Sequence, residues 1–390
     1  MLSKLKRHSF VCVLLSTLAV FPAVVHAFDL DEQVVMIPKP GLLSVNLETT
    51  IYKPHGDGPF PLAVINHGKS VGNPKLQSRY RPLPAVSYFL QRGYAVAVPM
   101  RQGFGNSGGK YVNPECDLVR NGYGQAEDVA AVLDYLDTQP YVNRHNILVL
   151  GQSHGGLTTL AFGAQNRPGV IGLINFAGGL RQQHCTGWES GLAQAAGAYA
   201  KQTRIPSLWF YGENDSYFSP TLYNSMHRRY TEAGGRARLI AFGKFGTDAH
   251  GMFGSRRGES IWQPEVTKFL EELGLPSRIM FPQYQLPPPL ESPPRTDYAA
   301  LNDTDAVPYL NKDAKEAYRA FLEKDTPRAF AIAPNGAYGW ATQGDDPLKN
   351  ALESCNKYVK ETCKLYVVDD FVVWPTNRAT ENTQVRLDQR

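Results

Sequence analysis

Short apolar runs alternate with amphipathic stretches through most of the chain. Each run is too short for a buried helix, so it predicts a strand that is buried on both faces of a sheet. The predicted strands are residues 61–66, 94–100, 146–150, 170–176, 207–211 and 238–242. The predicted helices are residues 85–92, 125–137, 189–201, 219–233 and 263–273, with a further helix directly after Ser153. Alternating strands and helices predict βαβ units, and therefore an α/β fold with a parallel sheet between two helical layers.

The segment 34–53 differs from these runs, because apolar and polar residues alternate along it. With the turn Pro40-Gly41 in its middle, it predicts a β-hairpin ahead of the parallel sheet. After Leu275 the composition changes. Prolines at positions 282, 287–289, 293 and 294 predict an extended linker rather than packed structure.

The region beyond these prolines predicts a second, smaller unit. Its predicted elements are a helix over 308–322, a hairpin of residues 330–333 and 338–342, a helix that starts at Asp346-Pro347 and a strand over 365–374. The aspartate is a suitable N-cap and the proline a suitable first helical residue. Together these elements predict a small α+β module.

The first 27 residues have the features of a signal peptide. Lys4, Lys6 and Arg7 precede an apolar run over residues 10–25, and small residues close the segment at Ala27. A retained membrane anchor is the alternative, but the run is short for a span and contains polar residues. We therefore expect cleavage near Ala27 and export to the periplasm or to the exterior.

The charge balance gives no indication of a nucleic-acid partner. The chain has 40 basic and 36 acidic residues, a formal net charge of +4. Three of the basic residues lie in the predicted signal peptide, so 37 basic and 36 acidic residues remain, a net charge of +1. Such a surface lacks the basic footprint of nucleic-acid-binding proteins. No later segment is apolar for long enough to form a stable membrane span.

The cysteines predict two disulfides. Of the five cysteines, Cys12 lies in the predicted signal peptide, and the remaining four favour disulfides in an exported protein. Three pairings are possible. Cys355 and Cys363 lie close together in one segment, which leaves Cys116 to pair with Cys185. No CxxC pair or Cys/His cluster has zinc-site spacing, so we expect neither a metal nor a cofactor.

The strongest chemical signal is the sequence GQSHG at residues 151–155, directly between a predicted strand and a predicted helix. A serine hydroxyl is a poor nucleophile, and it must be presented to a base on an exposed, tight turn. Glycines two residues before and two residues after Ser153 are what such a strained turn tolerates. The backbone N–H of His154 then faces the developing oxyanion. The pattern therefore predicts Ser153 as a nucleophile.

The partners of this serine are expected in later loops, an acid first and then a histidine. Asp215 follows the fifth predicted strand, and His250 follows the sixth. The carboxylate would hold the imidazole in its productive tautomer and stabilise the imidazolium. Glu213 is a rival for the acid. Asp248 is a further rival, but we expect it to shape the loop of His250.

The second oxyanion donor is expected in the loop after the first strand of the predicted parallel sheet, residues 66–70. The pair His67-Gly68 lets the backbone pass close to a substrate and offer an N–H. We expect the N–H of Lys69 to be this donor, with that of Gly68 as the alternative. The ring of His67 is expected to brace the loop.

Five segments, NHGKSVG, VPMRQGFGNSGG, GQSHGG, YGENDS and TDAHGMF, occur in an order and spacing that resemble the α/β-hydrolase superfamily. The chain is most similar to its dienelactone-hydrolase and prolyl-oligopeptidase-like branch, over residues 34–275. The resemblance implies a mostly parallel eight-stranded sheet and the roles given above for Ser153, Asp215 and His250. It also implies that Arg101, in the glycine-rich segment, is paired internally. The chain has serine where dienelactone hydrolases have cysteine, and it lacks the propeller of prolyl oligopeptidases.

These features predict a secreted serine hydrolase that cleaves carboxylic esters through an acyl-enzyme on Ser153. The substrate would be a small-molecule or polymer ester. A serine peptidase or amidase of the prolyl-oligopeptidase-like type is the alternative, since it would use the same triad. A disulfide between Cys116 and Cys185 would hold two loops beside the site, where Tyr123 and Trp188 could line an acyl pocket.

The predicted domain organisation has four parts. They are a signal peptide over residues 1–27, an α/β-hydrolase catalytic domain over 28–278, a proline-rich linker over 279–297 and a disulfide-containing α+β module over 298–390. The module resembles small disulfide-containing modules of secreted bacterial proteins. Its Trp340 and Trp374 are expected in its core, with sugar or polymer binding as the alternative.

Overall fold

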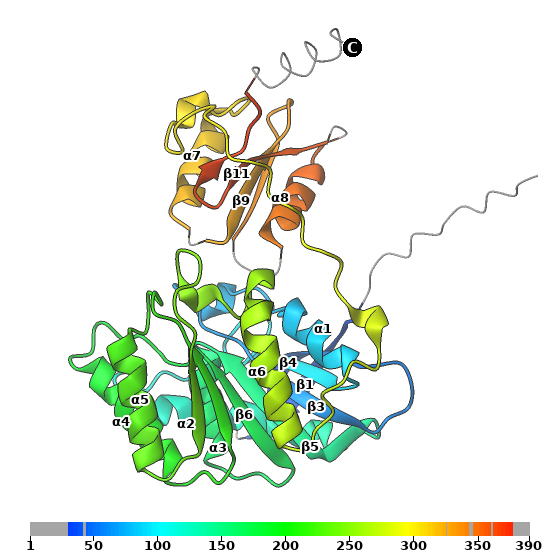
Figure 1. The fold of residues 1–390 in the computed structure, drawn as a ribbon, viewed down its shortest axis with the longest axis vertical. Helices are drawn as coiled ribbons and strands as arrows, with labels where there is room; N and C mark the ends of the chain where they lie inside the picture. The colour runs from blue at the N-terminus through cyan, green and yellow to red at the C-terminus, as the bar shows by residue number, and fades with distance from the viewer. Residues whose placement is uncertain (1–29, 42–43, 325, 343–345, 360–361, 377–390) are drawn as a thin grey trace, which may run out of the picture.

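The computed structural model describes residues 30–41, 44–324, 326–342, 346–359 and 362–376. These residues form an eight-stranded sheet between layers of helices and a separate four-stranded sheet (Figure 1). The predicted signal peptide, residues 1–27, lies outside the described residues. Within the described ranges, no helix is long and apolar enough to cross a membrane.

The large sheet is mostly parallel, with the strand order β1-β2-β4-β3-β5-β6-β7-β8. The β1–β2 and β2–β4 pairs are antiparallel, and the other neighbours are parallel. The strands are β1 (Gln33–Lys39), β2 (Val45–Tyr52), β3 (Phe60–Asn66), β4 (Ala95–Pro99), β5 (Val142–Gln152), β6 (Val170–Phe176), β7 (Ser207–Tyr211) and β8 (Ala237–Ala241). This confirms the fold that the resemblance implied, and β1 and β2 form the predicted hairpin.

Helices cover both faces of this sheet. They are α1 (Leu83–Gln91), α2 (Leu118–Leu136), α3 (His154–Gly163), α4 (Trp188–Ala200), α5 (Pro220–Glu232) and α6 (Glu259–Glu272). Strand β3 shows how the two layers are built. Val64 packs in the apolar cluster with α2 to α5, whereas the next residue, Ile65, packs in the cluster with α1 and α6. A strand that is buried on both faces needs consecutive apolar residues, which is the pattern in the sequence.

Helix α2 begins earlier than its apolar stripe predicts. It starts at Leu118, after Asp117, whose carboxylate accepts a backbone N–H of the first turn. The first turns bury Asn121 and Gln125, whose side-chain amides both donate to the carbonyl of Val112. Because these buried side chains are polar, hydrophobic periodicity does not detect this part of the helix.

The smaller sheet is antiparallel, with the strand order β10-β9-β11-β12. The elements of the module are α7 (Lys312–Leu322), β9 (Arg328–Ile332), β10 (Tyr338–Thr342), α8 (Pro347–Asn356), β11 (Lys364–Val368) and β12 (Phe371–Val372). Asp346 caps α8 as predicted. The single strand predicted over 365–374 is in fact two strands, because the chain turns at Asp369, whose φ is 52°. Trp340 and Trp374 pack against the apolar cluster of the module.

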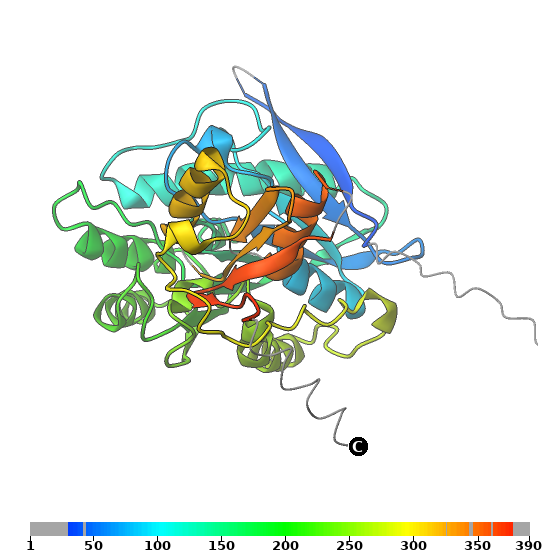
Figure 2. The same cartoon turned by 90° about the horizontal axis from the view of Figure 1, so that it is seen from above.

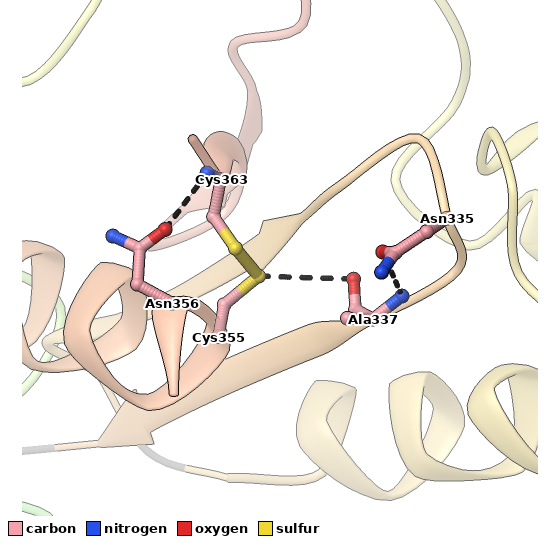
Figure 3. The surroundings of a disulfide bond; sticks show 5 residues. All are labelled: Asn335, Ala337, Cys355, Asn356 and Cys363. Atoms are coloured by element: carbon pink, nitrogen blue, oxygen red, sulfur yellow. Dashed lines mark hydrogen bonds between the residues drawn. A yellow bond between two sulfur atoms is a disulfide. The ribbon is translucent and has the colours of Figure 1, made fainter. Parts of the chain in front are cut away.

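A disulfide joins Cys355, in α8, to Cys363, which precedes β11 (Figure 3). The side-chain oxygen of Asn356 accepts the backbone N–H of Cys363 at 2.9 Å. The sulfur of Cys355 lies 3.7 Å from the carbonyl oxygen of Ala337, at the start of β10. The disulfide therefore fastens the end of α8 to the start of β11, beside the residue that precedes β10.

The segment between the two sheets is only partly a linker. Tyr284 and Leu286 are buried against the α1–α6 layer of the large sheet, and the carbonyl of Tyr284 accepts a hydrogen bond from Ser87 at 2.7 Å. Residues 279–286, which the sequence assigned to the linker, thus pack on the larger unit. Pro282 begins a short 3-10 helix, Pro282–Tyr284, where the prolines predicted extended backbone, and the aromatic residues of this stretch supply apolar surface for burial.

The small module lies at the edge of the large sheet where the parallel strands end. The side-chain hydroxyls of Thr326 and Thr247 form a hydrogen bond, and a Cβ placed on Gly251 would lie 3.9 Å from Pro327. Thr247 and Gly251 belong to the loop after β8, which also contains His250. Figure 2 shows the module from above, over the large sheet.

Candidate active site

Ser153 occupies a strained turn between β5 and α3. Its φ is 56° and its ψ is −124°, a backbone conformation that costs a non-glycine residue on the order of 1–3 kcal/mol. A Cβ at Gly151 would lie 2.3 Å from the carbonyl oxygen of Gly155, and a Cβ at Gly155 would lie 2.1 Å from that of Asn66. Neither position accepts a side chain. The glycines of the GQSHG motif therefore allow the close backbone contacts that hold the serine at the turn.

Asp215 and His250 come from the loops after β7 and β8, and the structure brings them together. The Nδ1 atom of His250 lies 3.0 Å from Oδ2 of Asp215, whose side chain is fully buried. The other carboxylate oxygen accepts the backbone N–H groups of Tyr217 at 2.8 Å and Phe218 at 3.0 Å. These bonds hold the carboxylate in place, so that Oδ2 faces Nδ1 of His250 and can accept its proton. Nε2 of His250 is then the basic nitrogen.

The loops that hold Ser153 and His250 lie side by side. Gln152, next to the serine, donates its side-chain amide to the carbonyl of His250 at 2.7 Å. The ring of Tyr217 stacks on the imidazole, with 4.4 Å between the centroids. The guanidinium of Arg181, from the loop after β6, lies 4.2 Å from the centroid of Tyr217. Loops after four consecutive strands thus meet at one edge of the sheet, where α/β folds place their sites.

Glu213 and Asp248, the two alternatives for the catalytic acid, do not contact the imidazole as Asp215 does. Glu213 is exposed. Asp248 accepts the backbone N–H of His250 at 2.9 Å, and both the N–H and the hydroxyl of Ser216. Asp248 therefore fixes the backbone of the histidine loop, while the imidazole itself contacts Asp215.

The loop after β3 passes directly over the serine. A Cβ placed on Gly68 would lie 3.3 Å from Cβ of Ser153. The buried ring of His67 contacts the carbonyl of Gly68 through Nδ1 at 2.6 Å and accepts the backbone N–H of Arg101 through Nε2 at 3.0 Å. Burial and the nearby guanidinium of Arg101 hold the pKa of His67 well below its usual value, so the ring is neutral.

Of the two predicted oxyanion donors, His154 directly follows the serine in sequence, and Lys69 lies in the loop that passes over it. His154 begins α3, and its buried ring lies between Arg101 and Asn121. Burial lowers the pKa of His154 well below its usual value. Lys69 follows Gly68, and burial also lowers the pKa of its ammonium group. The donor roles of the His154 and Lys69 N–H groups stay predictions.

A disulfide joins Cys116 to Cys185, with 5.6 Å between their Cα atoms. It links the loop before α2 to the loop before α4. His184 lies near the two sulfurs, but the disulfide engages both of them, so this group is not a free set of metal ligands. Tyr123 and Trp188 pack against the α2–α5 apolar cluster. Their role in an acyl pocket stays a prediction.

Two polar residues of the site escaped sequence reasoning. Gln152 lies inside the GQSHG motif, yet only the fold reveals its bond to the histidine loop. Asn121 contacts the ring of His154 with its side-chain oxygen, at 2.7 Å from Nε2. A signal existed for Asn121, because Asn121, Gln125 and Asp128 are polar residues at helical spacing. Such spacing on a buried helix indicates polar partners inside the fold.

Part of the chain matches a known protein family, and several solved structures are similar to it. Residues 44–206, less than half of the chain, match the X-Pro dipeptidyl-peptidase (S15) family. An esterase from Pyrococcus furiosus is 16% identical, with a TM-score of 0.47, over 65% of this chain and 96% of its own. A putative dienelactone hydrolase from Klebsiella pneumoniae is 17% identical, with a TM-score of 0.44, over 62% of this chain and 98% of its own.

A dipeptidyl peptidase 4 from Porphyromonas gingivalis is 18% identical, with a TM-score of 0.47, over 62% of this chain and 35% of its own. The comparison with curated proteins gave no match. The sheet order, the strained serine turn and the family match together define the class of protein. The chain has the α/β-hydrolase fold and is a serine hydrolase, which acts on an ester or on a peptide bond.

Proposed function

We propose that the protein hydrolyses carboxylic esters, with Ser153 as nucleophile, His250 as base and Asp215 as the residue that orients the base. The contact between a buried, fully hydrogen-bonded Asp215 and Nδ1 of His250 is the observation that carries this proposal. It sets the tautomer that general-base catalysis by Nε2 requires. The link from Gln152 to His250 supports the same assignment, because it holds the base beside the serine turn.

The proposed reaction has two steps. In the first, Oγ of Ser153 attacks the carbonyl carbon while Nε2 of His250 takes its proton, and the imidazolium then protonates the departing alkoxide. The product is an acyl-enzyme and a free alcohol. In the second, water gives a proton to Nε2 and attacks the acyl carbon, and the acid leaves as Oγ regains a proton. The N–H groups of His154 and Lys69 would stabilise the oxyanion of each tetrahedral intermediate.

The match with a dipeptidyl-peptidase family makes peptide cleavage the second candidate. The positively charged side chains in the loops around the site favour an ester over a peptide as the substrate. A dipeptidyl peptidase binds the protonated amino terminus of its substrate, and the half-buried Lys69 and Arg181 would repel that ammonium group. The carboxylates of Asp215 and Asp248 are engaged by His250 and Ser216. A neutral or anionic acyl ester fits this charge distribution better than a free peptide terminus.

A substrate panel with purified protein tests the proposal. We expect p-nitrophenyl butyrate to be cleaved with a higher kcat/KM than alanyl-prolyl-p-nitroanilide, after each rate is corrected for the uncatalysed reaction. A fluorophosphonate probe should label the wild type and leave the Ser153→Ala variant unlabelled. A higher kcat/KM for the anilide would show that the protein is a peptidase rather than an esterase. Labelling that persists in Ser153→Ala would refute the assigned nucleophile.

We infer that the protein works outside the cytoplasm. Two disulfides are expected in an oxidising compartment and are rare in cytosolic proteins. The predicted cleavage near Ala27 would release a chain that starts at Phe28. Sequencing the amino terminus of the protein from the periplasm or the medium tests this. A cytoplasmic protein that retains residues 1–27 would contradict it.

A further inference from the structure

Arg101 is a fully buried arginine that makes three side-chain hydrogen bonds beneath the serine turn. It follows β4, and none of its surface is exposed. One terminal nitrogen donates to the carbonyl of His67 at 2.7 Å, and the other donates to Nδ1 of His154 at 3.2 Å. Nε donates to the side-chain oxygen of Gln125 at 3.1 Å.

These bonds connect the two segments that supply the proposed oxyanion donors. His67 lies two residues before Lys69, on the loop that passes over Ser153. His154 is itself the other donor, through its backbone N–H. The planar guanidinium has a rigid arrangement of N–H groups, so it constrains the distance between the carbonyl of His67 and the ring of His154. A single side chain therefore connects the two segments that carry these N–H groups.

The charge of Arg101 is only weakly compensated. Its three acceptors are a backbone carbonyl, a neutral imidazole and an amide oxygen. Asp128 attracts the guanidinium from farther away, but that carboxylate already pairs with Lys39 at 2.7 Å and accepts the backbone N–H of Gln102 at 2.7 Å. Burial lowers the pKa of Arg101 to about 10, so the group is still protonated at neutral pH. A buried positive charge, with no carboxylate in direct contact, thus lies between the His67 loop and the ring of His154.

We propose that Arg101 is a positioning residue for the oxyanion hole, which holds the Lys69 and His154 N–H groups in place and adds its buried charge to their attraction for the oxyanion. The inference rests on the proposed function, but it applies to ester and amide substrates alike. A preorganised charge acts on the negative charge that develops in the transition state, and much less on the neutral ground state. The effect should therefore appear in kcat rather than in KM.

The test compares Arg101→Met with a matched control, Arg92→Met. Arg92 also has a buried guanidinium that donates to carbonyls, those of Tyr88 and Ser277, but it lies at the end of α1 and outside the site. We expect Arg101→Met to lower kcat by about a hundredfold or more, the scale of a lost oxyanion donor, with little change in KM. Affinity for an alkylboronic acid, which forms an anionic tetrahedral adduct on serine, should fall in parallel. Arg92→Met should lower Tm and leave kcat unchanged.

A second variant keeps the inference testable if Arg101→Met does not fold. Arg101→Lys retains the charge but carries all its N–H donors on one nitrogen, so it cannot span the three separated acceptors; kcat should fall by about tenfold, and boronate affinity should fall with it. A wild-type kcat in Arg101→Lys, or equal losses of kcat in Arg101→Met and Arg92→Met, would overturn the inference. A folded wild type that cleaves neither esters nor anilides would refute the proposed function itself, and this is measured first.

Discussion

Replacing Asp215 by asparagine should reverse the tautomer of His250. The backbone N–H groups of Tyr217 and Phe218 both donate to Oδ1 of Asp215, so an asparagine at this position must turn its amide oxygen toward them. Its NH₂ group then occupies the place of Oδ2 and faces Nδ1 of His250, now 3.0 Å from a carboxylate oxygen. A donor in that place forces Nδ1 to accept, and the proton moves to Nε2. The base then has no free lone pair for the serine.

The expected cost of Asp215→Asn is large, because the wrong tautomer lowers kcat by about 10⁴ in a known serine protease. That factor corresponds to about 5 kcal/mol of transition-state stabilisation. The assay is kcat on p-nitrophenyl butyrate, with Tm as the measure of folding and ¹⁵N NMR of the imidazole as the measure of the tautomer. The matched control is Glu213→Gln, an exposed side chain two residues away, which should change kcat less than about twofold. A greater loss in Glu213→Gln than in Asp215→Asn would show that the acid is misassigned.

Three further predictions concern other parts of the molecule. Ser153→Ala should abolish hydrolysis with little loss of stability; activity above about a thousandth of the wild type would count against the nucleophile. The mature protein should show no free thiols by intact mass after alkylation, and two or more would contradict the disulfides of Cys116 with Cys185 and Cys355 with Cys363. A chain that ends at Leu290 should still cleave small soluble esters, and a soluble, folded but inactive truncation would show that the module completes the site.

The sequence predicted the serine turn because that feature is local. Glycines at fixed distances from a serine, between a strand and a helix, describe one backbone conformation within a few residues. The pairing of Asp215 with His250 is not local, but it follows from topology. Each residue comes just after a parallel strand, and the carboxyl ends of such strands meet at one edge of the sheet. The order of strands therefore brings the two loops together without any side-chain detail.

The polar network under the site could not be predicted in the same way. Arg101, Gln125, Asn121 and Gln152 each bond to a residue on a different element, and no sequence period relates the partners. Hydrophobic periodicity detects helix and strand faces that bury apolar surface against any apolar neighbour. A buried polar side chain instead needs a specific hydrogen-bond partner within bonding distance. The early start of α2 was missed for the same reason.

The placement of the small module also depends on information that the sequence pattern lacks. The prolines predicted a spacer from residue 279, but Tyr284 and Leu286 are buried on the larger unit, so the first part of that segment belongs to it. The next residues contact both units, because Arg256 donates to the carbonyl of Pro287 and the N–H of Leu290 donates to Asp346. The module contacts the histidine loop through Thr326 and Thr247. The module thus borders the loop that carries His250, at the edge of the large sheet where the proposed site lies.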